Sequence, residues 1–369
     1  MEFSIARDAL LKELQFLQGV VERRNTIPVL SNLLIESTEY GTVRLLATDL
    51  DTTLRCETGA EIIGEGRMLI PARKLFDIVR SLPDGEVHLR GEANNWVELR
   101  SGRARFRLAS AAPSDFPALP SVGTPSPLEI AASHLSSMIE RTIFAITLEE
   151  ARYTLSGAKF IYTREFVRMV TTDGHRLAFI ELKAEPGQGK EIDALIPRKA
   201  LAELARLAST YDGSVKLWTT ENHIHFEIGP RLLVARLLAG QFPNYEMVMP
   251  RASARKARLD CALFAGAIRR VALMADDRSR AIRLAFSPNG LQISAQSAEE
   301  GSSEERVDVD YDGEEIEIGF NAQYLLDFLQ VVGEGEILFE FKDANSQAQL
   351  RPVAQDGFDY RYIVMPMRL

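Results

Sequence analysis

Cysteine is scarce in this sequence, and long hydrophobic runs are absent. The two cysteines, Cys56 and Cys261, lie far apart among 369 residues, which argues against a disulfide scaffold or a cysteine-ligated zinc site. No apolar run approaches the roughly 18 residues of a membrane-spanning helix, and the first residues lack the basic and apolar regions of a signal peptide. We therefore expect a cytoplasmic protein with two buried thiols and no membrane contact.

Motifs typical of enzyme active sites are also missing. The sequence holds no Gly-rich phosphate loop, no nucleophile elbow and no histidines or carboxylates at metal-ligand spacing. Residues 171–177 place Asp173 two positions before His175, one of five histidines, but no Ser or Cys motif accompanies them. We interpret this segment as a strand and tight turn whose His175 and Arg176 line a groove. We expect no catalytic residue, metal or cofactor; an enzyme with its site around Asp173 and His175 is the alternative.

What the sequence does contain is a threefold repeat with a period near 125 residues. Each copy opens with a strand end and, five positions later, the start of an apolar helical stripe. These paired positions are Ile5 and Leu10, Ile130 and Leu135, and Leu259 and Phe264. A second strand-and-helix segment recurs around Leu75, Leu201 and Leu325, which are 126 and 124 residues apart. The constant spacing indicates three copies of one unit.

Capping residues and a recurring strand extend the pattern. We expect Asp8, Ser133 and Asp260 to cap the first helix of each copy. Residues 43–49, 167–173 and 291–296 read as one strand written three times, with turn residues nearby.

These features predict an α+β protein of three tandem similar domains, each with two helices and a majority of strands. About 120 residues is an ordinary domain size, whereas solenoid units run to roughly 20–50 residues. The junctions are residues 111–127, with five prolines, and a basic segment that ends at Arg258. We expect domains at 1–120, 128–250 and 251–369. A repeat without a repeated catalytic constellation favours a geometric function.

Charge is unevenly distributed. The net charge of −9 is unusual for a nucleic-acid binder. Basic residues nevertheless gather on or beside four of the six expected helices, whereas acidic residues concentrate in 299–317. The basic set is Arg23, Arg24, Arg73, Lys74, Arg80, Arg198, Lys199, Arg206, Arg269 and Arg270. Basic residues on ordinary solvent-exposed helix faces would give the same pattern. Their recurrence on four helices nevertheless favours one shared basic face that contacts DNA. A monomeric sequence-specific DNA-binding protein is a second alternative, and it would need a base-reading helix.

Five motifs together resemble the bacterial sliding clamp family, the beta subunit of DNA polymerase III. They are RNTIPVLSNLL at 24–34, IPARKLFD at 70–77, TTDGHRL at 171–177, QFPNY at 241–245 and YIVMPMRL at 362–369. The resemblance implies a DNA clamp fold, in which two three-domain subunits join head to tail in a six-domain ring with helices inside and sheets outside. It also implies a processivity factor without catalysis that slides on duplex DNA, because phosphate contacts carry no sequence information.

Two sets of contacts come with the resemblance. The residues implied for DNA binding are Arg24, Arg73, Arg152 and Tyr153, although Glu149 and Glu150 do not favour a phosphate contact. A groove is implied for short, mostly apolar peptides of the clamp loader, the replicative polymerase alpha subunit, other polymerases and repair proteins. Its residues are Leu155, Thr172, Gly174, His175, Arg176, Leu177, Pro243, Met247, Val248, Met365, Pro366, Met367 and Arg368. At Met247 the family often has a polar or basic residue, so the resemblance does not fix the peptide preference of the groove's rim.

The subunit contact of the homodimer is expected between the first domain of one copy and the third of the other. Residues 103–108 alternate basic with apolar side chains, so one face packs while the other meets charge. The first surface comprises Lys74, Arg103, Arg105, Phe106 and Leu108. The second comprises Leu273, Met274, Glu299, Glu300, Glu304 and Glu305. Phe106 and Leu108 read equally well as ordinary core residues.

Overall fold

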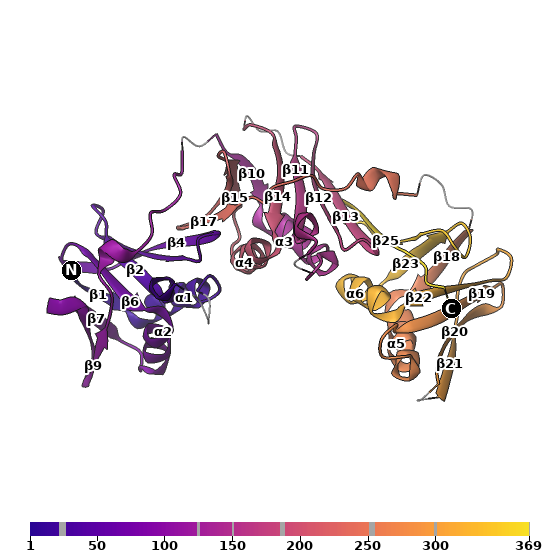
Figure 1. The fold of residues 1–369 in the computed structure, drawn as a ribbon, viewed down its shortest axis with the longest axis horizontal. Helices are drawn as coiled ribbons and strands as arrows, with labels where there is room; N and C mark the ends of the chain where they lie inside the picture. Colours follow the sequence, from indigo (N-terminus) through magenta and orange to yellow (C-terminus); the bar gives the residue numbers. More distant parts are fainter. Residues whose placement is uncertain are drawn as a thin grey trace. The chain divides into compact units, whose positions relative to one another are not determined.

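The computed structural model describes residues 1–21, 27–123, 126–149, 151–184, 189–250, 255–298 and 301–368. Within these ranges the chain forms six α-helices and four β-sheets (Figure 1). The helices are α1 (Arg7–Leu17), α2 (Ala72–Ser81), α3 (Ala132–Glu140), α4 (Arg198–Ala208), α5 (Cys261–Val271) and α6 (Ala322–Val332). The mixture of helices and sheets agrees with the predicted α+β class.

Two of the sheets have eight strands each. Sheet B has the order β10 (Leu128–Ala131), β15 (Ser214–Thr219), β16 (His223–Ile228), β17 (Arg231–Arg236), β4 (Thr52–Gly59), β3 (Thr42–Thr48), β2 (Asn32–Ser37) and β6 (Arg67–Pro71). Sheet C has the order β14 (Ile192–Pro197), β11 (Gly157–Tyr162), β12 (Phe166–Thr172), β13 (Arg176–Lys183), β25 (Phe358–Val364), β24 (Ala348–Pro352), β23 (Glu336–Phe341) and β18 (Arg255–Asp260).

The other two sheets are smaller. Sheet A has the order β5 (Glu61–Gly64), β1 (Glu2–Ala6), β7 (Glu86–Gly91), β8 (Trp96–Ser101) and β9 (Ala104–Ala109). Sheet D has the order β21 (Gly301–Val307), β20 (Gly290–Ser297), β19 (Ala281–Ser287) and β22 (Ile316–Asn321). Strands β9 and β21 are therefore edge strands.

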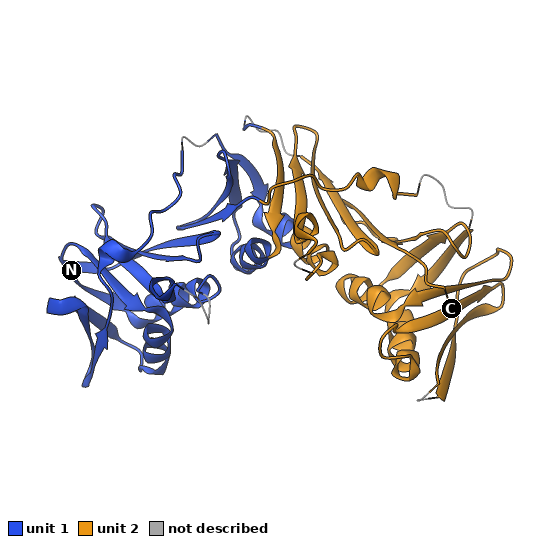
Figure 2. Ribbon diagram, viewed as in Figure 1, with its two compact units in different colours: residues 1–136, 187–190, 199–237 blue, residues 137–186, 191–198, 238–369 orange. Residues whose placement is uncertain are grey.

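The chain packs as two compact units, which Figure 2 colours separately. Residues 1–136, 187–190 and 199–237 form the first unit, and residues 137–186, 191–198 and 238–369 form the second. Each eight-stranded sheet lies within one unit. In sheet B, β17 from the central third of the sequence pairs with β4 from the first third, and in sheet C, β13 from the central third pairs with β25 from the last third. The central third of the sequence thus contributes strands to both units. The domain limits expected from the sequence stay a prediction.

The threefold repeat is visible in the order of the elements. A strand runs directly into a helix at β1–α1, β10–α3 and β18–α5, and again at β6–α2, β14–α4 and β22–α6. Leu75, Leu201 and Leu325 are all fully buried, so the register of the second segment is confirmed. The strand expected three times is also confirmed, as β3, β12 and β20. The apolar stripes are buried against sheets, as helical periodicity predicts.

The capping prediction is right at one position and wrong at two. Asp260 precedes α5 and accepts a hydrogen bond from the Leu263 amide at 2.8 Å. Asp8 is instead the second residue of α1, which begins after Ala6 without a side-chain cap. Ser133 is likewise the second residue of α3. Because these helices follow a strand without an intervening loop, a capping residue type just inside the helix does not mark its start.

Both thiols are buried, as expected. Burial, with Glu13 nearby, raises the pKa of Cys56, and burial raises the pKa of Cys261 to about 11. Neither cysteine is therefore a thiolate at neutral pH. In the described part of the chain no helix is long and apolar enough to cross a membrane.

We expect His225 in β16 to make the stability of the first unit sensitive to acid. Its ring is fully buried and stacks on Trp218, with centroids 5.1 Å apart. Nε2 lies 3.1 Å from the Thr220 hydroxyl, while buried Nδ1 has no hydrogen-bond partner among the described residues. Burial, and then His223, lowers the pKa of His225 from its usual 6.5 to about 4. Between these values the unfolded chain binds a proton that the folded chain does not, so stability falls as pH falls.

We expect His225→Phe to reduce this acid sensitivity, since phenylalanine keeps the stacking and cannot bind a proton. At about pH 5 the wild-type unit should have lost about 2 kcal/mol of unfolding free energy that the variant retains, relative to about pH 7.5. Urea unfolding followed by Trp218 fluorescence in a Trp96→Phe background measures the difference, because the sequence has two tryptophans. An equal acid-induced loss in both proteins would show that His225 is not its source.

Candidate functional site

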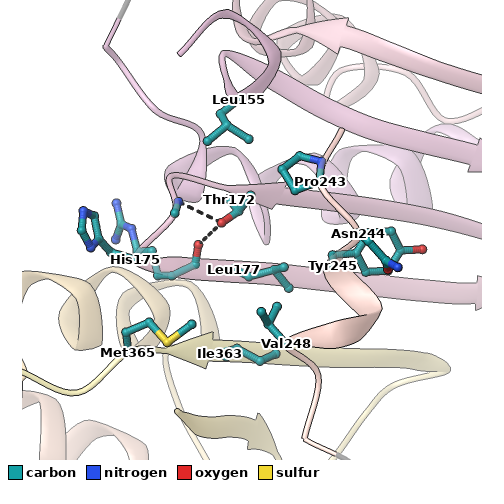
Figure 3. A pocket seen from close by; sticks show the side chains of 12 residues that line it. Leu155, Thr172, His175, Leu177, Pro243, Asn244, Tyr245, Val248, Ile363 and Met365 are labelled. Carbon is teal, nitrogen blue, oxygen red and sulfur yellow. Dashed lines mark hydrogen bonds between the residues drawn. The ribbon is translucent and has the colours of Figure 1, made fainter. Parts of the chain in front are cut away.

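A tight turn between β12 and β13 forms one edge of the site. The Thr172 hydroxyl donates to the Arg176 carbonyl at 2.6 Å and accepts from the Gly174 amide at 3.1 Å (Figure 3). Asp173 Oδ1 accepts from the amides of His175 and Arg176 at 2.9 and 3.0 Å. Gly174 has a φ of 90°, which other residues rarely adopt. The turn is thus held in shape by its own side chains.

Arg176 anchors this turn to distant parts of the second unit. Its side chain is 10% exposed; Nη1 donates to Asp327 of α6 at 2.5 Å, and Nε donates to Asp173 at 2.9 Å. Nη2 donates to the Phe144 carbonyl at 2.8 Å, and the guanidinium lies 4.4 Å from the Tyr324 ring centroid. Burial opposes its charge, but Tyr362, Asp327 and Asp173 raise the pKa of Arg176. Each of the three guanidinium nitrogens therefore has a hydrogen-bond partner.

A cavity of about 140 Å³ opens beside the turn. Strand β25 pairs with β13, which sets Ile363 opposite Leu177, and the Met365 amide donates to the His175 carbonyl at 2.9 Å. Leu177, Ile363 and Val248 come together from β13, β25 and the segment after the 3-10 helix Tyr245–Met247 (Figure 3). The lining is mostly apolar, with polar side chains at the turn and at Asn244, so the cavity suits an apolar side chain.

Nine of the thirteen residues expected for the groove line this cavity. They are Leu155, Thr172, Gly174, His175, Arg176, Leu177, Pro243, Val248 and Met365. Met247 is next to it and 80% exposed, whereas Pro366 does not line it. Met367 and Arg368 line a different cleft.

Three lining residues were not among the expected ones. Asn244 and Tyr245 belong to the QFPNY motif, and Ile363 belongs to the C-terminal motif, so the signal was present in the sequence. The Tyr245 hydroxyl accepts from Arg168 at 2.8 Å, which fixes this wall of the cavity.

The residues expected to bind DNA differ in exposure and in their ion pairs. Arg73 is exposed in the first turn of α2 and makes no hydrogen bond or ion pair within the described part of the chain. Arg152 is 3.1 Å from Glu149 and donates to the Asp173 carbonyl at 2.5 Å, so its charge is partly neutralised. Tyr153 is 54% exposed. Arg24 lies outside the described residues.

Several of the basic helix residues already have carboxylate partners. Arg80 pairs with Asp77, Lys199 with Asp49, Arg206 with Glu203 and Arg270 with Glu305. The exposed cations without an ion pair on the described helices are Lys12, Arg73, Lys74, Arg198 and Arg269. Any basic face therefore carries less free charge than the sequence indicates. Arg23 lies outside the described residues.

Five of the residues expected at the subunit contact lie on the edge strands β9 and β21: Arg105, Phe106, Leu108, Glu304 and Glu305. Phe106 and Leu108 are half-buried on edge strand β9, so neither is a fully buried core residue. Leu273 is 77% exposed and Met274 is half-buried. Lys74, Arg103 and Glu304 are exposed. Arg105 pairs with buried Glu98, and Glu305 pairs with Arg270 at 2.6 Å. Glu299 and Glu300 lie outside the described residues.

The geometry around Asp173 and His175 does not favour catalysis. Both carboxylate oxygens of Asp173 accept hydrogen bonds from the turn or from Arg176. The His175 ring stacks near Tyr324, with centroids 6.4 Å apart. Asp173 thus has a structural role, and among the described residues no cluster of three potential metal ligands occurs.

Comparisons with known proteins match the whole chain. Models of the N-terminal, central and C-terminal domains of the DNA polymerase III beta subunit match residues 1–120, 129–244 and 246–368. The chain is 40% identical over 372 residues to the beta sliding clamp of Pseudomonas aeruginosa. It is 38% identical over 377 residues to that of Caulobacter vibrioides, and both alignments cover 100% of each chain.

Solved structures have the same fold. The crystal structure of DNA polymerase III subunit beta from Pseudomonas aeruginosa matches with a TM-score of 0.94 at 38% identity. A sliding clamp from Bartonella birtlesii bound to griselimycin matches with a TM-score of 0.95 at 35% identity, and both matches cover 100% of each chain. The fold is thus three tandem beta-subunit domains, and the chain belongs to the DNA polymerase III beta subunit family of bacterial sliding clamps.

Proposed function

We propose that two copies of this chain close head to tail around duplex DNA and tether replication proteins, without catalysis of their own. In this proposal the cavity beside the β12–β13 turn takes a short, mostly apolar peptide from the clamp loader, the polymerase alpha subunit, other polymerases or repair proteins, in the cytoplasm. One observation carries it: nine residues implied by the family resemblance, from four separate parts of the sequence, line one apolar cavity.

The cavity has the properties that a shared docking site needs. Its floor of Leu177, Val248 and Ile363 offers apolar contact without demanding one side-chain shape. Met365 at its wall is flexible and polarizable, so it adapts to different ligands. The His175 side chain at the turn provides a polar group that orients a bound peptide, and Arg176 holds that turn in place. Several partners can therefore use one site in turn.

Ring closure is supported by the sheet edges. Edge strands β9 and β21 each have one side without a partner strand in the described part of the chain. A head-to-tail contact joins two different surfaces, which suits a basic first surface and an acidic second one. Arg105 and Glu305 already have partners within their own chain, so the charge attraction would come mainly from Lys74, Arg103 and Glu304. Phe106, Leu108 and Leu273 would supply the apolar contact.

The decisive experiment separates encirclement from adhesion. The protein is loaded by a clamp loader onto a nicked circular plasmid, the salt concentration is raised, and the plasmid is then cut once. Release only after cutting is the expected result, because topology retains a ring at any ionic strength. Release by salt alone from the intact circle would contradict the clamp proposal, since phosphate contacts weaken with salt.

We expect Arg73→Ala to weaken loading and to reduce the salt dependence of DNA association. Removing one phosphate contact should lower the slope of log affinity against log salt by about one for each subunit. Filter binding over a range of salt concentrations measures the slope. The matched control is Arg67→Ala, because Arg67 is also exposed but pairs with Glu36 at 2.7 Å on sheet B. Equal slopes for the wild type and Arg73→Ala would remove Arg73 from the DNA contacts.

A further inference from the structure

Another cavity lies on sheet B, within the first unit. It encloses about 370 Å³ where β4 runs past the start of β17. The Glu57 amide still donates to the Pro230 carbonyl at 3.1 Å, whereas Thr58 and Gly59 have no partner residue in β17. A Cβ atom at Gly59 would meet no atom within 4 Å, so the cavity is open at this strand end. The charged residues that line it are Arg55, Glu57, Glu227 and Arg231.

Arg55 is the charged lining residue that lacks a partner. Its half-buried side chain makes no hydrogen bond or ion pair with any described residue. In the sheet it lies between two apolar residues, since Leu46 of β3 and Leu232 of β17 are opposite it. Arg231, the other cation of the cavity, is already neutralised by its buried pair with Glu13.

The two carboxylates of the cavity are also engaged elsewhere. Glu57 shares a face of β4 with the unpaired arginine, because the two residues are two positions apart. The Thr42 hydroxyl donates to one Glu57 oxygen at 2.7 Å, and Arg44 Nη2 lies 3.6 Å from the other. Glu227 is 3.2 Å from Lys216 on β15. Since each carboxylate already serves another group, neither forms an ion pair with the arginine between them.

Arg44 increases the need for a further negative charge. Burial, and then Arg44, lowers the pKa of Arg55, and the opposing effects of Glu57 and Glu227 do not cancel this shift. The Arg44 Nε is itself buried and has no hydrogen-bond partner in the described part of the chain. An arginine does not lose its proton in a protein. The unbalanced charge is therefore relieved by a bound anion and not by titration.

The surroundings favour a carboxylate over a phosphate. The planar fork of an arginine matches both anions. A phosphate carries up to two negative charges, however, and Glu57 and Glu227 would repel the second one. The cavity is also larger than a carboxylate group alone can fill, and its volume falls in the range of about 300–1,000 Å³ that is typical of ligand sites. It therefore has room for the chain that carries the carboxylate.

We propose that this cavity binds an acidic side chain from a peptide segment of a partner protein, with the carboxylate on Arg55. The inference goes beyond the proposed clamp function and does not depend on it. None of the charged residues that line the cavity belongs to the apolar cavity of the second unit, to the expected DNA contacts or to the expected subunit contact.

Methyl NMR of the full chain with labelled leucines tests the inference, because Leu232 is buried and lines the cavity. The probes are a blocked glycine–glutamate–glycine peptide, its glutamine counterpart, acetate and inorganic phosphate, each titrated at constant ionic strength. The glutamate peptide should shift the Leu232 methyl signals with an affinity about tenfold higher than that of the glutamine peptide, as one charge-assisted contact provides. Acetate and phosphate should both bind more weakly than the glutamate peptide.

Three variants assign the effect to the cavity. Arg55→Met should abolish the preference for glutamate. Arg236→Met is the matched control and should preserve it, because Arg236 is exposed on β17, has no ion pair among the described residues and does not line the cavity. Glu227→Gln removes a repelling charge and should tighten binding of the glutamate peptide about two- to threefold.

Four results would overturn the inference. The first is equal binding of the glutamate and glutamine peptides, and the second is a preference for glutamate that survives Arg55→Met. The third is binding of acetate or phosphate as tight as that of the glutamate peptide, which would assign the cavity to a free anion. The fourth is unchanged or weaker binding in Glu227→Gln, and this comparison still decides the matter if Arg55→Met does not fold.

Discussion

Replacing Arg231 by methionine should lower the free energy of opening of the α1–β17 region by about 3–5 kcal/mol, because it leaves a buried carboxylate without its partner. Arg231 Nε and Nη2 donate to Glu13 at 2.7 and 2.6 Å, and both side chains are 6% exposed. The guanidinium also lies 4.3 Å from the Phe16 ring centroid. Native-state hydrogen exchange of amides in α1 and β17 measures this local opening without assuming a single unfolding step.

Two comparisons isolate the ion pair. Lys216→Met in the same unit breaks an exposed pair with Glu227, and it should cost less than about 1 kcal/mol. The double variant Glu13→Leu with Arg231→Met should recover most of the loss, since two apolar side chains of similar size leave no buried charge. If Arg231→Met lowers the free energy of opening no more than Lys216→Met does, the buried pair does not stabilise this part of the molecule.

The positions of the helices and the repeated strand could be predicted because they follow from burial. Leu75, Leu201 and Leu325 keep the same register because each fills the same place between a helix and a sheet. The pairing of Glu13 with Arg231 could not be predicted, since 218 residues separate them and each is polar in an otherwise apolar pattern. The pairing of β17 with β4 and of β13 with β25 could not be predicted either. Strands pair through backbone hydrogen bonds, which depend little on the type of side chain.

The candidate site was predicted in two different ways. Residue chemistry alone indicated a strand and tight turn at 171–177 with His175 and Arg176 beside a groove, and the structure has both the turn and the cavity. The other walls came only from the family resemblance, because nothing in the spacing links Leu155, Pro243 and Met365. The charge pattern overestimated the free basic surface, since a sequence does not show that Lys199 reaches Asp49 or that Arg270 reaches Glu305.

Replacing Arg176 by methionine should weaken the binding of the short apolar peptide by about 30- to 100-fold, which corresponds to leaving charged buried groups unsatisfied. Asp173 and Asp327 would lose their shared guanidinium, and the Phe144 carbonyl would lose a donor. The turn from Thr172 to Arg176 would then lose its anchor on α6, and the cavity edge would lose its shape. Fluorescence anisotropy with the short peptide measures the loss.

Two further variants show whether geometry or charge is responsible. Arg176→Lys keeps the positive charge but cannot reach Asp173, Asp327 and the Phe144 carbonyl together, because an ammonium lacks the planar fork. It should therefore recover only part of the affinity. Arg258→Met removes an exposed arginine, 3.4 Å from Glu336, from the same sheet and should leave peptide binding unchanged. Full affinity in Arg176→Lys would mean that charge alone orients the peptide, and full affinity in Arg176→Met would mean that the cavity keeps its shape without this anchor.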